Sequence, residues 1–423
     1  MRWSVSILSS LVWLLATQGV RCLEEDESSP LNKTLWRRVR DPGGDGGGET
    51  PTISDLFLIG DSSLKGGCSS KLDVLNGWLN EVNLLHEAAK TVYGGYRTNK
   101  NYAVLLMDFF GFGIEVNGKK GDPSNTYGIE NMDNYFVEEN WKMLGDRLAG
   151  VSQFLAGAGL RDPVVPGEPP RIFCSDDAAE LAGLGDIVKD KSQNEVVTAR
   201  DPSTNEPTEY LTISRAFRTS GGNIFWMSAY NGYLNLKKYT PDDNSACPVK
   251  KVNADGSGGT RYAVTNRGTR PVDLYKDIEF GNANRVILFC PAAFEPDQWV
   301  AGAAGNSHNY PSLAQAISPD NYPGNGGTLD NLGLDNILPV SATFYHELYH
   351  LTDIGDTADP YYKMKDIFKA AKGTGGLAVP TFKNPETFTM FAMAAYMLIN
   401  APEGMDPMIY YQGRPMKASL IPY

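Results

Sequence analysis

Residues 344–351 are the most informative part of this chain and read Phe344-Tyr345-His346-Glu347-Leu348-Tyr349-His350-Leu351. Its two histidines are four residues apart, so on a helix they lie on one face, within reach of a single metal ion. Glu347 follows the first histidine directly, which places its carboxylate beside the metal without making it a ligand. We therefore expect His346 and His350 to bind zinc, and Glu347 to take a proton from water as the general base.

A catalytic zinc ion needs a third protein ligand and one open position. No histidine follows His350 in the sequence, which excludes a pattern with three histidines. The acidic candidates downstream are Asp353, Asp356 and Asp359. Asp353 follows His350 too closely to turn onto the metal while the helix continues. We expect Asp353 and Asp356 to be solvated or to lie behind the ligands.

Residues 357–362 resemble a motif of a known family. They read Thr357-Ala358-Asp359-Pro360-Tyr361-Tyr362, which is similar to the Thr-x-Asp-x-x-Tyr motif of the deuterolysin-like aspzincins. These are secreted fungal zinc metallopeptidases that include lysine-specific endopeptidases. The resemblance implies that Asp359 is the third zinc ligand and that Tyr362 donates a hydrogen bond to the oxyanion of the transition state. The chain departs from the family in having Asp356 and Lys363 where glycines are usual.

Two further blocks resemble the same family, so the resemblance covers about residues 285 to 398. The blocks are Val286-Ile287-Leu288-Phe289-Cys290 with Phe294, and Asn384-Pro385-Glu386-Thr387-Phe388 with Phe391-Ala392. In the lysine-specific members two acidic side chains on this late helix line the substrate pocket. Only Glu386 is matched here, and Thr389 stands where the second acid is expected. The resemblance therefore implies that Glu386 binds substrate, and it leaves the specificity open.

Four cysteines lie in the part of the chain that we expect to be mature: Cys68, Cys174, Cys247 and Cys290. None of them belongs to a Cys-x-x-Cys pair, so in an oxidising compartment disulfides are favoured over zinc ligation. Four cysteines allow three pairings. The family resemblance implies that Cys68 pairs with Cys174 and Cys247 with Cys290.

The N-terminal residues indicate export from the cell. Residues 1–19 combine a basic start, an apolar stretch and small residues, which is the pattern of a signal peptide. Residues 20–40 are expected to form a short propeptide with a glycosylation site at Asn32, and residues 41–52 a flexible Gly-rich linker. Residues 53–423 are expected to form a single metallopeptidase domain, with the zinc site in about residues 285–400. The protein is expected to be secreted and extracellular.

The chain of 423 residues has a formal net charge of −12 and a sequence pI of about 4.9. Nucleic acids and anionic membranes select basic surfaces, so we expect neither as a partner. After the N-terminal stretch no segment of the sequence is long and apolar enough to span a bilayer. The expected partners are protein or peptide substrates, and nothing in the sequence demands more than a monomer.

The spacing of apolar residues predicts the secondary structure. Leucine and valine at helical intervals predict helices over residues 69–93 and 137–155. Short runs of strand-forming residues predict strands at Tyr102–Met107, Arg171–Cys174, Asn223–Tyr230 and Arg285–Cys290. We expect an α+β, zincin-like domain that is predominantly helical, with a small sheet and the His-Glu-x-x-His helix at the active site.

The two remaining histidines are expected to have ordinary roles. His86 continues the apolar stripe of the first helix, and Lys90 stands where a second metal-binding histidine would be needed. We therefore expect His86 to be a packing residue. His308 lies in a polar loop and is expected at the surface. The aromatic group Phe225, Trp226 and Tyr230 is expected in the core.

These observations predict a secreted zinc metalloendopeptidase that hydrolyses peptide bonds with water activated by Glu347. The alternative is a non-catalytic, secreted zinc-binding protein of the same ancestry, similar to fungal surface antigens. The presence of Glu347 and the lack of a His/Cys-rich tail favour the enzyme. A third possibility is a degenerate peptidase that serves as a binding module, with its cleft blocked by residues 295–339.

Overall fold

A computed structural model describes residues 50–119, 122, 124–163, 166–217, 222–237, 244–248, 261–266, 280–295, 312–324, 333–353, 357–373 and 380–421. Residues 49–423 form one compact unit, which is the unit described below. The expected signal peptide, the propeptide with Asn32 and most of the linker lie outside the described residues, as do His308 and Asp356. Within the described ranges, no helix has both the length and the apolar character that a membrane span requires.

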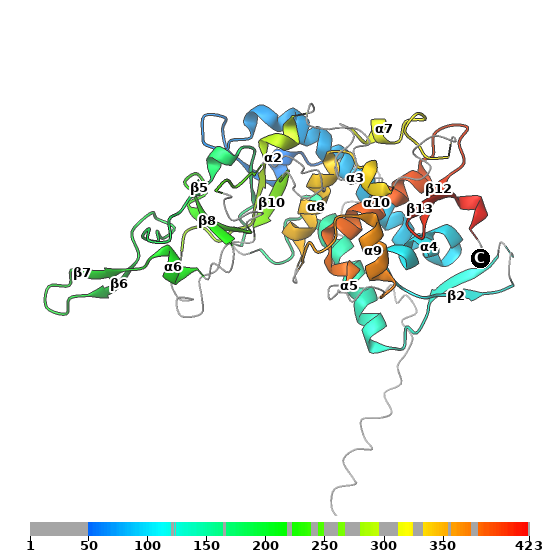
Figure 1. The fold of residues 1–423 in the computed structure, drawn as a ribbon, viewed down its shortest axis with the longest axis horizontal. Coiled ribbons are helices and arrows are strands. Elements are labelled where there is room, and N and C mark those ends of the chain that lie inside the picture. The colour runs from blue at the N-terminus through cyan, green and yellow to red at the C-terminus, as the bar shows by residue number, and fades with distance from the viewer. Residues whose placement is uncertain are drawn as a thin grey trace, which may run out of the picture. The chain divides into compact units, whose positions relative to one another are not determined.

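Helices and several small sheets make up the unit (Figure 1). The helices are α2 (Ile53–Leu56), α3 (Leu72–Gly95), α4 (Lys100–Phe110), α5 (Tyr135–Leu155), α6 (Ile213–Ala216), α7 (Leu313–Ala316), α8 (Ser341–Thr352), α9 (Met364–Ala371) and α10 (Pro385–Ile399). The strands are β1 (Leu58–Ile59), β2 (Ile114–Asn117), β3 (Thr126–Ile129), β4 (Arg171–Phe173), β5 (Glu180–Leu181), β6 (Val197–Arg200), β7 (Pro207–Tyr210), β8 (Gly222–Met227), β9 (Gly232–Lys237), β10 (Ala263–Asn266), β11 (Val286–Phe289), β12 (Met408–Tyr411) and β13 (Arg414–Lys417).

A four-stranded sheet in the order β1-β4-β11-β10 lies next to the metal-binding motif. Its first three strands are parallel, and β10 pairs with β11 antiparallel at the edge. Every residue of β11 is buried, because successive side chains enter two different cores. Ile287 and Phe289 face the helices, whereas Val286 and Leu288 face the smaller core built around β8 and β9. The strand predicted at Arg285–Cys290 is thus the centre of the fold.

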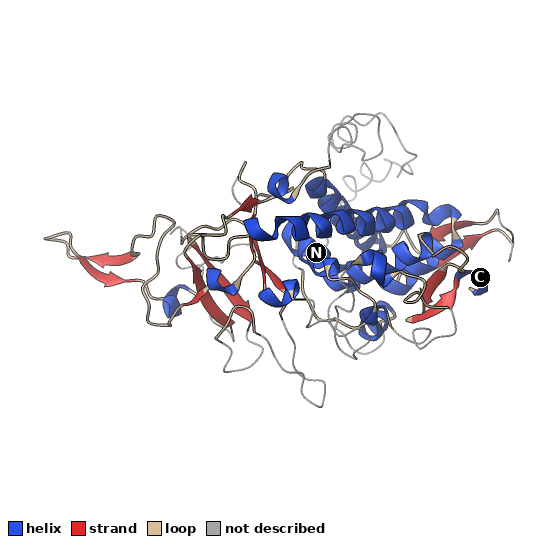
Figure 2. Ribbon diagram, turned by 90° about the horizontal axis from the view of Figure 1, so that it is seen from above, coloured by secondary structure: helices blue, strands red, loops and turns tan. Residues whose placement is uncertain are grey.

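The long helices pack against one another (Figure 2). The stripe of Leu75, Leu79 and Val82 on α3 is buried, and the predicted second helix is α5. The helices α8 and α10 are buried on nearly every side, because α8 contacts α3, α5 and α10 as well as the strands β10 and β11. A helix that is surrounded in this way holds its side chains in fixed positions. This is the setting that a metal site requires.

The strand predicted at Tyr102–Met107 is wrong, because these residues lie in α4. The Asn99 side chain accepts hydrogen bonds from the main-chain N–H of Asn101 and Tyr102, and Gly111, in the left-handed conformation, ends the helix. Nearly all of α4 is buried, so its apolar residues show no helical stripe. A short continuous apolar run of this kind cannot be assigned to helix or strand by periodicity.

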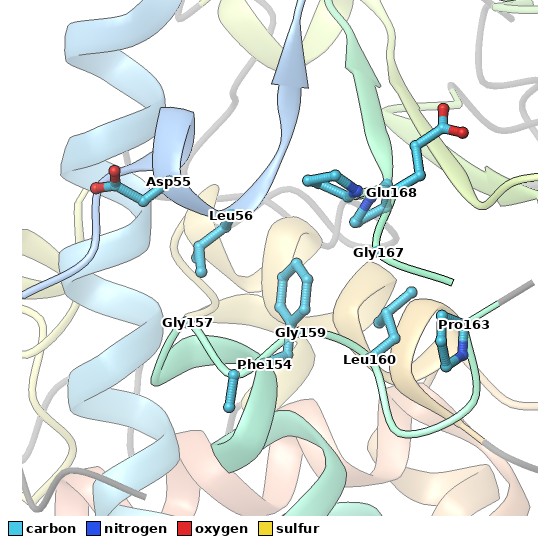
Figure 3. Close-up of a pocket in the computed structure, with 12 residues that line it drawn as sticks. Asp55, Leu56, Phe154, Gly157, Gly159, Leu160, Pro163, Gly167 and Glu168 are labelled. Atoms are coloured by element: carbon cyan, nitrogen blue, oxygen red, sulfur yellow. The ribbon is translucent and has the colours of Figure 1, made fainter. Parts of the chain in front are cut away.

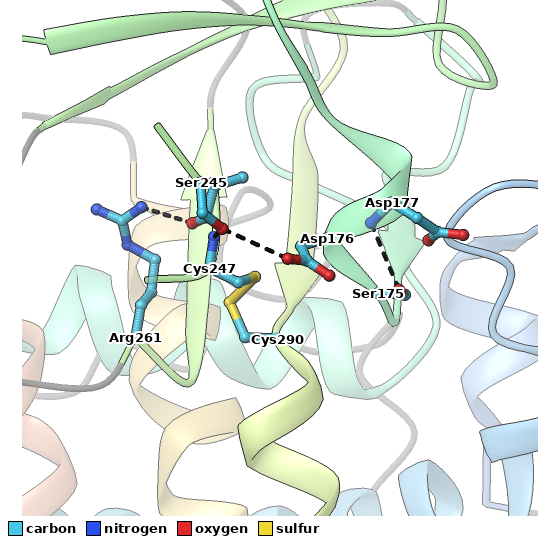
Figure 4. The surroundings of a disulfide bond; sticks show 8 residues. Ser175, Asp176, Asp177, Ser245, Cys247, Arg261 and Cys290 are labelled. Atoms are coloured by element: carbon cyan, nitrogen blue, oxygen red, sulfur yellow. Dashed lines mark hydrogen bonds between the residues drawn. A yellow bond between two sulfur atoms is a disulfide. The ribbon is translucent and has the colours of Figure 1, made fainter. Parts of the chain in front are cut away.

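Two disulfides tie the sheet to the rest of the chain. Cys68 pairs with Cys174 after β4, and Cys247 pairs with Cys290 after β11, which is the pairing that the family resemblance implied. Around the second disulfide Arg261 donates a hydrogen bond to the carbonyl of Ala246 (Figure 4). The disulfide and this hydrogen bond attach the segment before β10 to the end of β11. They therefore hold β10 at the edge of the sheet.

A three-stranded antiparallel sheet, β5-β8-β9, extends from the main sheet together with the hairpin β6–β7 (Figure 1). The predicted strand at Asn223–Tyr230 corresponds to β8 and the turn after it. Phe225 and Tyr230 are buried, and Trp226 is half-buried against Tyr233 at 4.7 Å between ring centroids. The aromatic group is therefore core, as predicted.

Candidate metal centre

The helix α8 carries three of the predicted site residues: His346, Glu347 and His350. It ends at Thr352, and buried arginines from other elements surround this end. Arg147 of α5 pairs with Asp353 at 3.2 Å, and Arg285 donates a hydrogen bond to the carbonyl of Leu351. Cations at the C-terminus of a helix complement its dipole and the carbonyls that lack partners within the helix. The two arginines therefore hold the C-terminal end of α8 in place.

Asp353 is buried and engaged by Arg147, so the expectation that it is solvated is wrong. The described residues contain one group of histidine, cysteine or acidic side chains that could hold a metal ion: His346, His350 and Asp359. The Asp359 carboxylate lies 3.0 Å from His350 Nε2 and 3.4 Å from His346 Nε2, and the two Nε2 atoms are 3.2 Å apart. The three predicted ligands thus converge on one point.

These spacings fit a single metal ion. Ligand atoms at about 2.0–2.1 Å from a tetrahedral ion lie about 3.3 Å from each other, and all three distances are close to that value. Two imidazole nitrogens and one carboxylate oxygen also form a donor set that binds divalent transition metals. The residues present can therefore hold one ion and leave its fourth position open.

The other nitrogen of each imidazole has a partner of its own. His346 Nδ1 lies 2.8 Å from Glu386 Oε2 of α10, and His350 Nδ1 lies 2.8 Å from Thr357 Oγ1. An ionised carboxylate only accepts hydrogen bonds, so Nδ1 of His346 carries the proton and its Nε2 lone pair faces the other ligands. This is the arrangement that orients histidine ligands in metal sites.

Glu386 therefore contacts His346 at Nδ1, the ring nitrogen that does not face the other two ligands. The resemblance implied that this carboxylate lines a substrate pocket, whereas in the structure it is buried at 5% exposure and hydrogen-bonded to His346. Thr389, the position of the absent second acid, is also buried and donates to the carbonyl of Pro385. The described hydrogen bonds of Glu386 and Thr389 are thus made to other groups of the protein.

The charges of the site favour a cation between the ligands. Burial disfavours the charged form of Asp359, but hydrogen bonds from His346 and His350 lower the pKa of its carboxyl well below the usual range. Burial likewise disfavours the charged form of His346, but the carboxylates of Asp359 and Glu386 raise its pKa well above 6.5. The two carboxylates therefore attract either protons or a metal ion to the imidazoles.

Glu347 points toward the edge strand of the main sheet. Thr265 Oγ1, in β10, lies 2.6 Å from Glu347 Oε2 and 3.2 Å from the main-chain oxygen of Glu347. The hydroxyl therefore donates to the carboxylate and fixes its direction. Nothing in the sequence pointed to Thr265, which lies 82 residues before Glu347. Val264 packs against the smaller core around β8 and β9, and successive side chains of a strand point to opposite faces, so Thr265 faces the helices.

Tyr362 lies over the ring of His346. The two rings are nearly parallel, with 6.1 Å between their centroids and an angle of 13°. The side chain of Tyr362 is 51% exposed, although it adjoins the buried ligands. Its loop is attached to α10 by two hydrogen bonds, from Ala358 N–H to the carbonyl of Lys383 and from the Asn384 amide to the carbonyl of Tyr361. The predicted tyrosine is therefore beside the metal-binding group, on its solvent side.

His86 is a packing residue, as predicted. Its ring is buried, with Nδ1 2.9 Å from the Tyr345 hydroxyl and Nε2 2.7 Å from Ser152 Oγ. The Tyr345 hydroxyl in turn lies 2.8 Å from that of Tyr349. Burial, with a smaller contribution from Lys90, lowers the pKa of His86 to about 3. This neutral histidine links α3 and α5 to the far side of α8.

A separate pocket of about 320 Å³ lies between α2, the end of α5 and residues 157–163 and 167–170 (Figure 3). Leu56, Phe154 and Leu160 line it, whereas the carboxylates of Asp55 and Glu168 point outward. It shares no residue with the metal-binding group. Small-molecule sites usually combine apolar walls with convergent polar side chains, which this pocket does not show.

Comparison with known proteins adds a partial similarity. No family model matches the chain, and no solved structure matches it. A protein of Penicillium expansum described as "Non-secreted LysM effector LysM17" is 35% identical over 159 residues. The match covers 36% of this chain and 19% of that protein, so the chain spans about a fifth of the relative's length. Similarity over so small a share of both chains assigns neither a family nor an activity.

Proposed function

We propose that this protein is a secreted zinc-dependent endopeptidase with a zincin-like fold. The observation that carries the proposal is the convergence of His346, His350 and Asp359, together with a buried glutamate, Glu347, directly after His346 in α8. Two imidazoles and one carboxylate with an open fourth position form a donor set that catalytic zinc sites use. A buried carboxylate next to such an ion, but outside its ligands, has the place of a general base.

The zinc ion would polarise the substrate carbonyl and lower the pKa of a water molecule toward neutrality. Glu347 accepts the proton of the attacking water at its carboxylate and passes it to the nitrogen of the leaving amine. The hydrogen bond from Thr265 keeps the carboxylate on the β10 side of α8 during both transfers. No covalent bond forms between protein and substrate in this mechanism.

Two further residues support the reaction in this proposal. Tyr362 donates a hydrogen bond to the oxyanion that develops on the attacked carbonyl, since its ring lies beside His346 on the solvent side. Glu386 holds the imidazole of His346 in the tautomer that binds metal. We therefore assign Glu386 to the support of the metal, in place of the substrate-binding role that the resemblance implied.

A peptide substrate has a place to bind beside Glu347. In the part of the chain that the structure describes, β10 pairs with β11 on one side only. An extended peptide can add to such an edge through main-chain hydrogen bonds. Because Thr265 of β10 reaches Glu347, a peptide on this edge would lie close to the base. A protein or peptide substrate is therefore part of the proposal.

Secretion is proposed from the signal-like residues 1–19 and from the two disulfides, which form in oxidising compartments. The relative from Penicillium expansum is described as non-secreted, so the location has to be measured. Expression of the full chain in a fungal host, followed by detection in medium and cells, tests it. Protein that stays in the cells with residues 1–19 intact would refute the proposal.

The function is tested by cleavage of a mixed peptide library with and without a chelator, with metal content measured in parallel. We compare the wild type with Glu347→Gln and with the control Glu87→Gln, which alters an exposed glutamate of α3. Cutting that requires zinc, is abolished by Glu347→Gln and is kept by Glu87→Gln supports the endopeptidase. One bound zinc per chain without any cutting supports the non-catalytic zinc-binding alternative.

A further inference from the structure

A group of lysines follows the metal-binding loop in the sequence. Residues 363–383 contain five lysines and one aspartate, Asp366, in a chain whose net charge is −12. Four of these lysines belong to α9 or its ends, namely Lys363, Lys365, Lys369 and Lys372. The fifth, Lys383, lies in the turn before α10. A short basic surface therefore stands on an acidic protein.

The basic surface is the exposed face of the amphipathic helix α9. Met364 and Ile367 are buried against the core, whereas Lys365, Lys369 and Lys372 are exposed. The three lysines are separated by steps of four and three residues, so they form one stripe on the outer face of the helix. The stripe is about 10 Å long at 1.5 Å per residue, which is the length of about three residues of an extended peptide.

The stripe begins at the metal-binding loop. Lys363 directly follows Tyr362, whose ring lies over His346. On the other side of the loop, the carbonyl of Lys383 accepts a hydrogen bond from Ala358, the residue before the ligand Asp359. Lysines thus flank both sides of the loop that carries Asp359 and Tyr362. A peptide that reaches the metal-binding group on this side passes the lysines.

The acidic side chains near the stripe offset its charge only in part. Asp366 lies 3.9 Å from Lys369, and both side chains are exposed to solvent, which screens the pair. The carboxyls of Asp108 and Asp335 also interact with lysines of the stripe; Asp108 is buried and Asp335 is half-buried. Burial raises the pKa of Asp108 to about 7, which reduces its negative charge near neutral pH, and burial also raises the pKa of Asp335.

We propose that this lysine stripe selects acidic peptide segments as substrates of the site. The inference rests on the proposed endopeptidase function and adds its substrate class: polypeptides with a short run of aspartate or glutamate within a few residues of the cut bond. A long polyanion fits less well, because beyond the roughly 10 Å reach of the stripe it meets a protein with net negative charge. A short acidic run gains the attraction without that repulsion.

The test uses two zinc-loaded variants with the same change in charge. Lys365→Glu/Lys369→Glu reverses the charge of the stripe. Lys65→Glu/Lys191→Glu reverses the charge of two exposed lysines near β5 and β6, strands that lie far from α9 in Figure 1. Cleavage of a peptide library gives the ratio of kcat/KM for acidic and uncharged peptides. We expect this ratio to fall about tenfold in the stripe variant and to stay near the wild-type value in the control.

Binding is measured separately from cleavage, by fluorescence anisotropy of a labelled peptide with three consecutive glutamates and the Glu347→Gln protein. Added salt should weaken this binding, since exposed charges are screened. If no peptide is cut but the acidic peptide still binds through Lys365 and Lys369, the endopeptidase proposal is refuted and the binding of acidic peptides by the lysine stripe is supported. If the wild type cuts peptides without a preference for acidic ones, the role of the lysine stripe is refuted and the endopeptidase proposal is supported. Tighter binding of single-stranded RNA or phosphatidylserine vesicles through the same lysines would also overturn it.

Discussion

Low pH should lower the free energy of unfolding of this protein through His86. A single substitution of His86 should remove this contribution to the loss of stability. The ring is buried, and both of its nitrogens are hydrogen-bonded to hydroxyl groups. Burial lowers its pKa from the ordinary 6.5 to about 3. Below pH 6.5 the unfolded chain therefore binds a proton at His86 that the folded protein does not bind. Stability from this group is present above pH 6.5 and is lost as the pH falls toward 3.

The loss can be calculated without an accurate folded-state pKa, provided that the pH stays above it. Between pH 7.5 and pH 4.5 the unfolded state gains about 2.7 kcal/mol from protonation of one histidine with a pKa of 6.5. His86→Gln keeps a side chain that can donate and accept hydrogen bonds but cannot titrate in this range. The wild type should therefore lose about 2.7 kcal/mol more than the variant over this interval.

The assay is urea unfolding followed by tryptophan fluorescence at several pH values, with both proteins in the same metal state and with intact disulfides. Carboxylates and the ligand histidines titrate in both proteins, so their effects cancel in the difference. His86→Gln can be less stable at every pH, because the amide packs differently from the ring, but the difference between the two proteins must still change with pH. Parallel curves would refute the reasoning, since they would show that His86 does not resist protonation in the folded state.

Three further outcomes are expected. Glu386→Gln should weaken zinc binding about 10- to 100-fold, measured by competition with a chelating dye, because the amide no longer fixes the ligand tautomer; an unchanged affinity would contradict this role. Arg147→Met should lower the free energy of unfolding by about 3–5 kcal/mol, because it removes a buried cation that pairs with the buried carboxylate of Asp353. Adding Asp353→Asn to Arg147→Met should restore part of this loss. Cys68→Ala/Cys174→Ala should cost up to about 4.7 kcal/mol in urea unfolding, since the disulfide closes a loop of 106 residues; a loss under about 1 kcal/mol would contradict the entropic account.

Local patterns predicted the elements whose residues have neighbours close in sequence. The histidines of α8 are four residues apart, so the geometry of one helix brings them together whatever surrounds it. The buried stripe of α3 follows from the same periodicity. The run at Tyr102–Met107 shows the limit of this reasoning, since an element that is buried on all sides has no polar face to reveal its period.

Contacts between segments far apart in the sequence could not be predicted from local sequence patterns. The resemblance gave Glu386 a place in a substrate pocket, whereas the packing of α10 on α8 brings its carboxylate to His346. Asp353 was expected to be solvated or to lie behind the ligands, whereas in the structure Arg147 of α5, 206 residues away in sequence, pairs with it. Such contacts depend on how helices pack, and helix packing is not encoded by the spacing of residues within one helix.

The amino-acid sequence alone indicates that His346, Glu347 and His350 lie on one helix, that Asp359 follows soon after it, and that the chain is acidic overall. These features depend on residue type and short spacing. Only the tertiary structure decided what holds each group: Glu386 and Thr357 on the imidazoles, and Thr265 on the carboxylate. The physical reason is that hydrogen bonds across a fold form between groups that packing brings together, and packing is a property of the whole core.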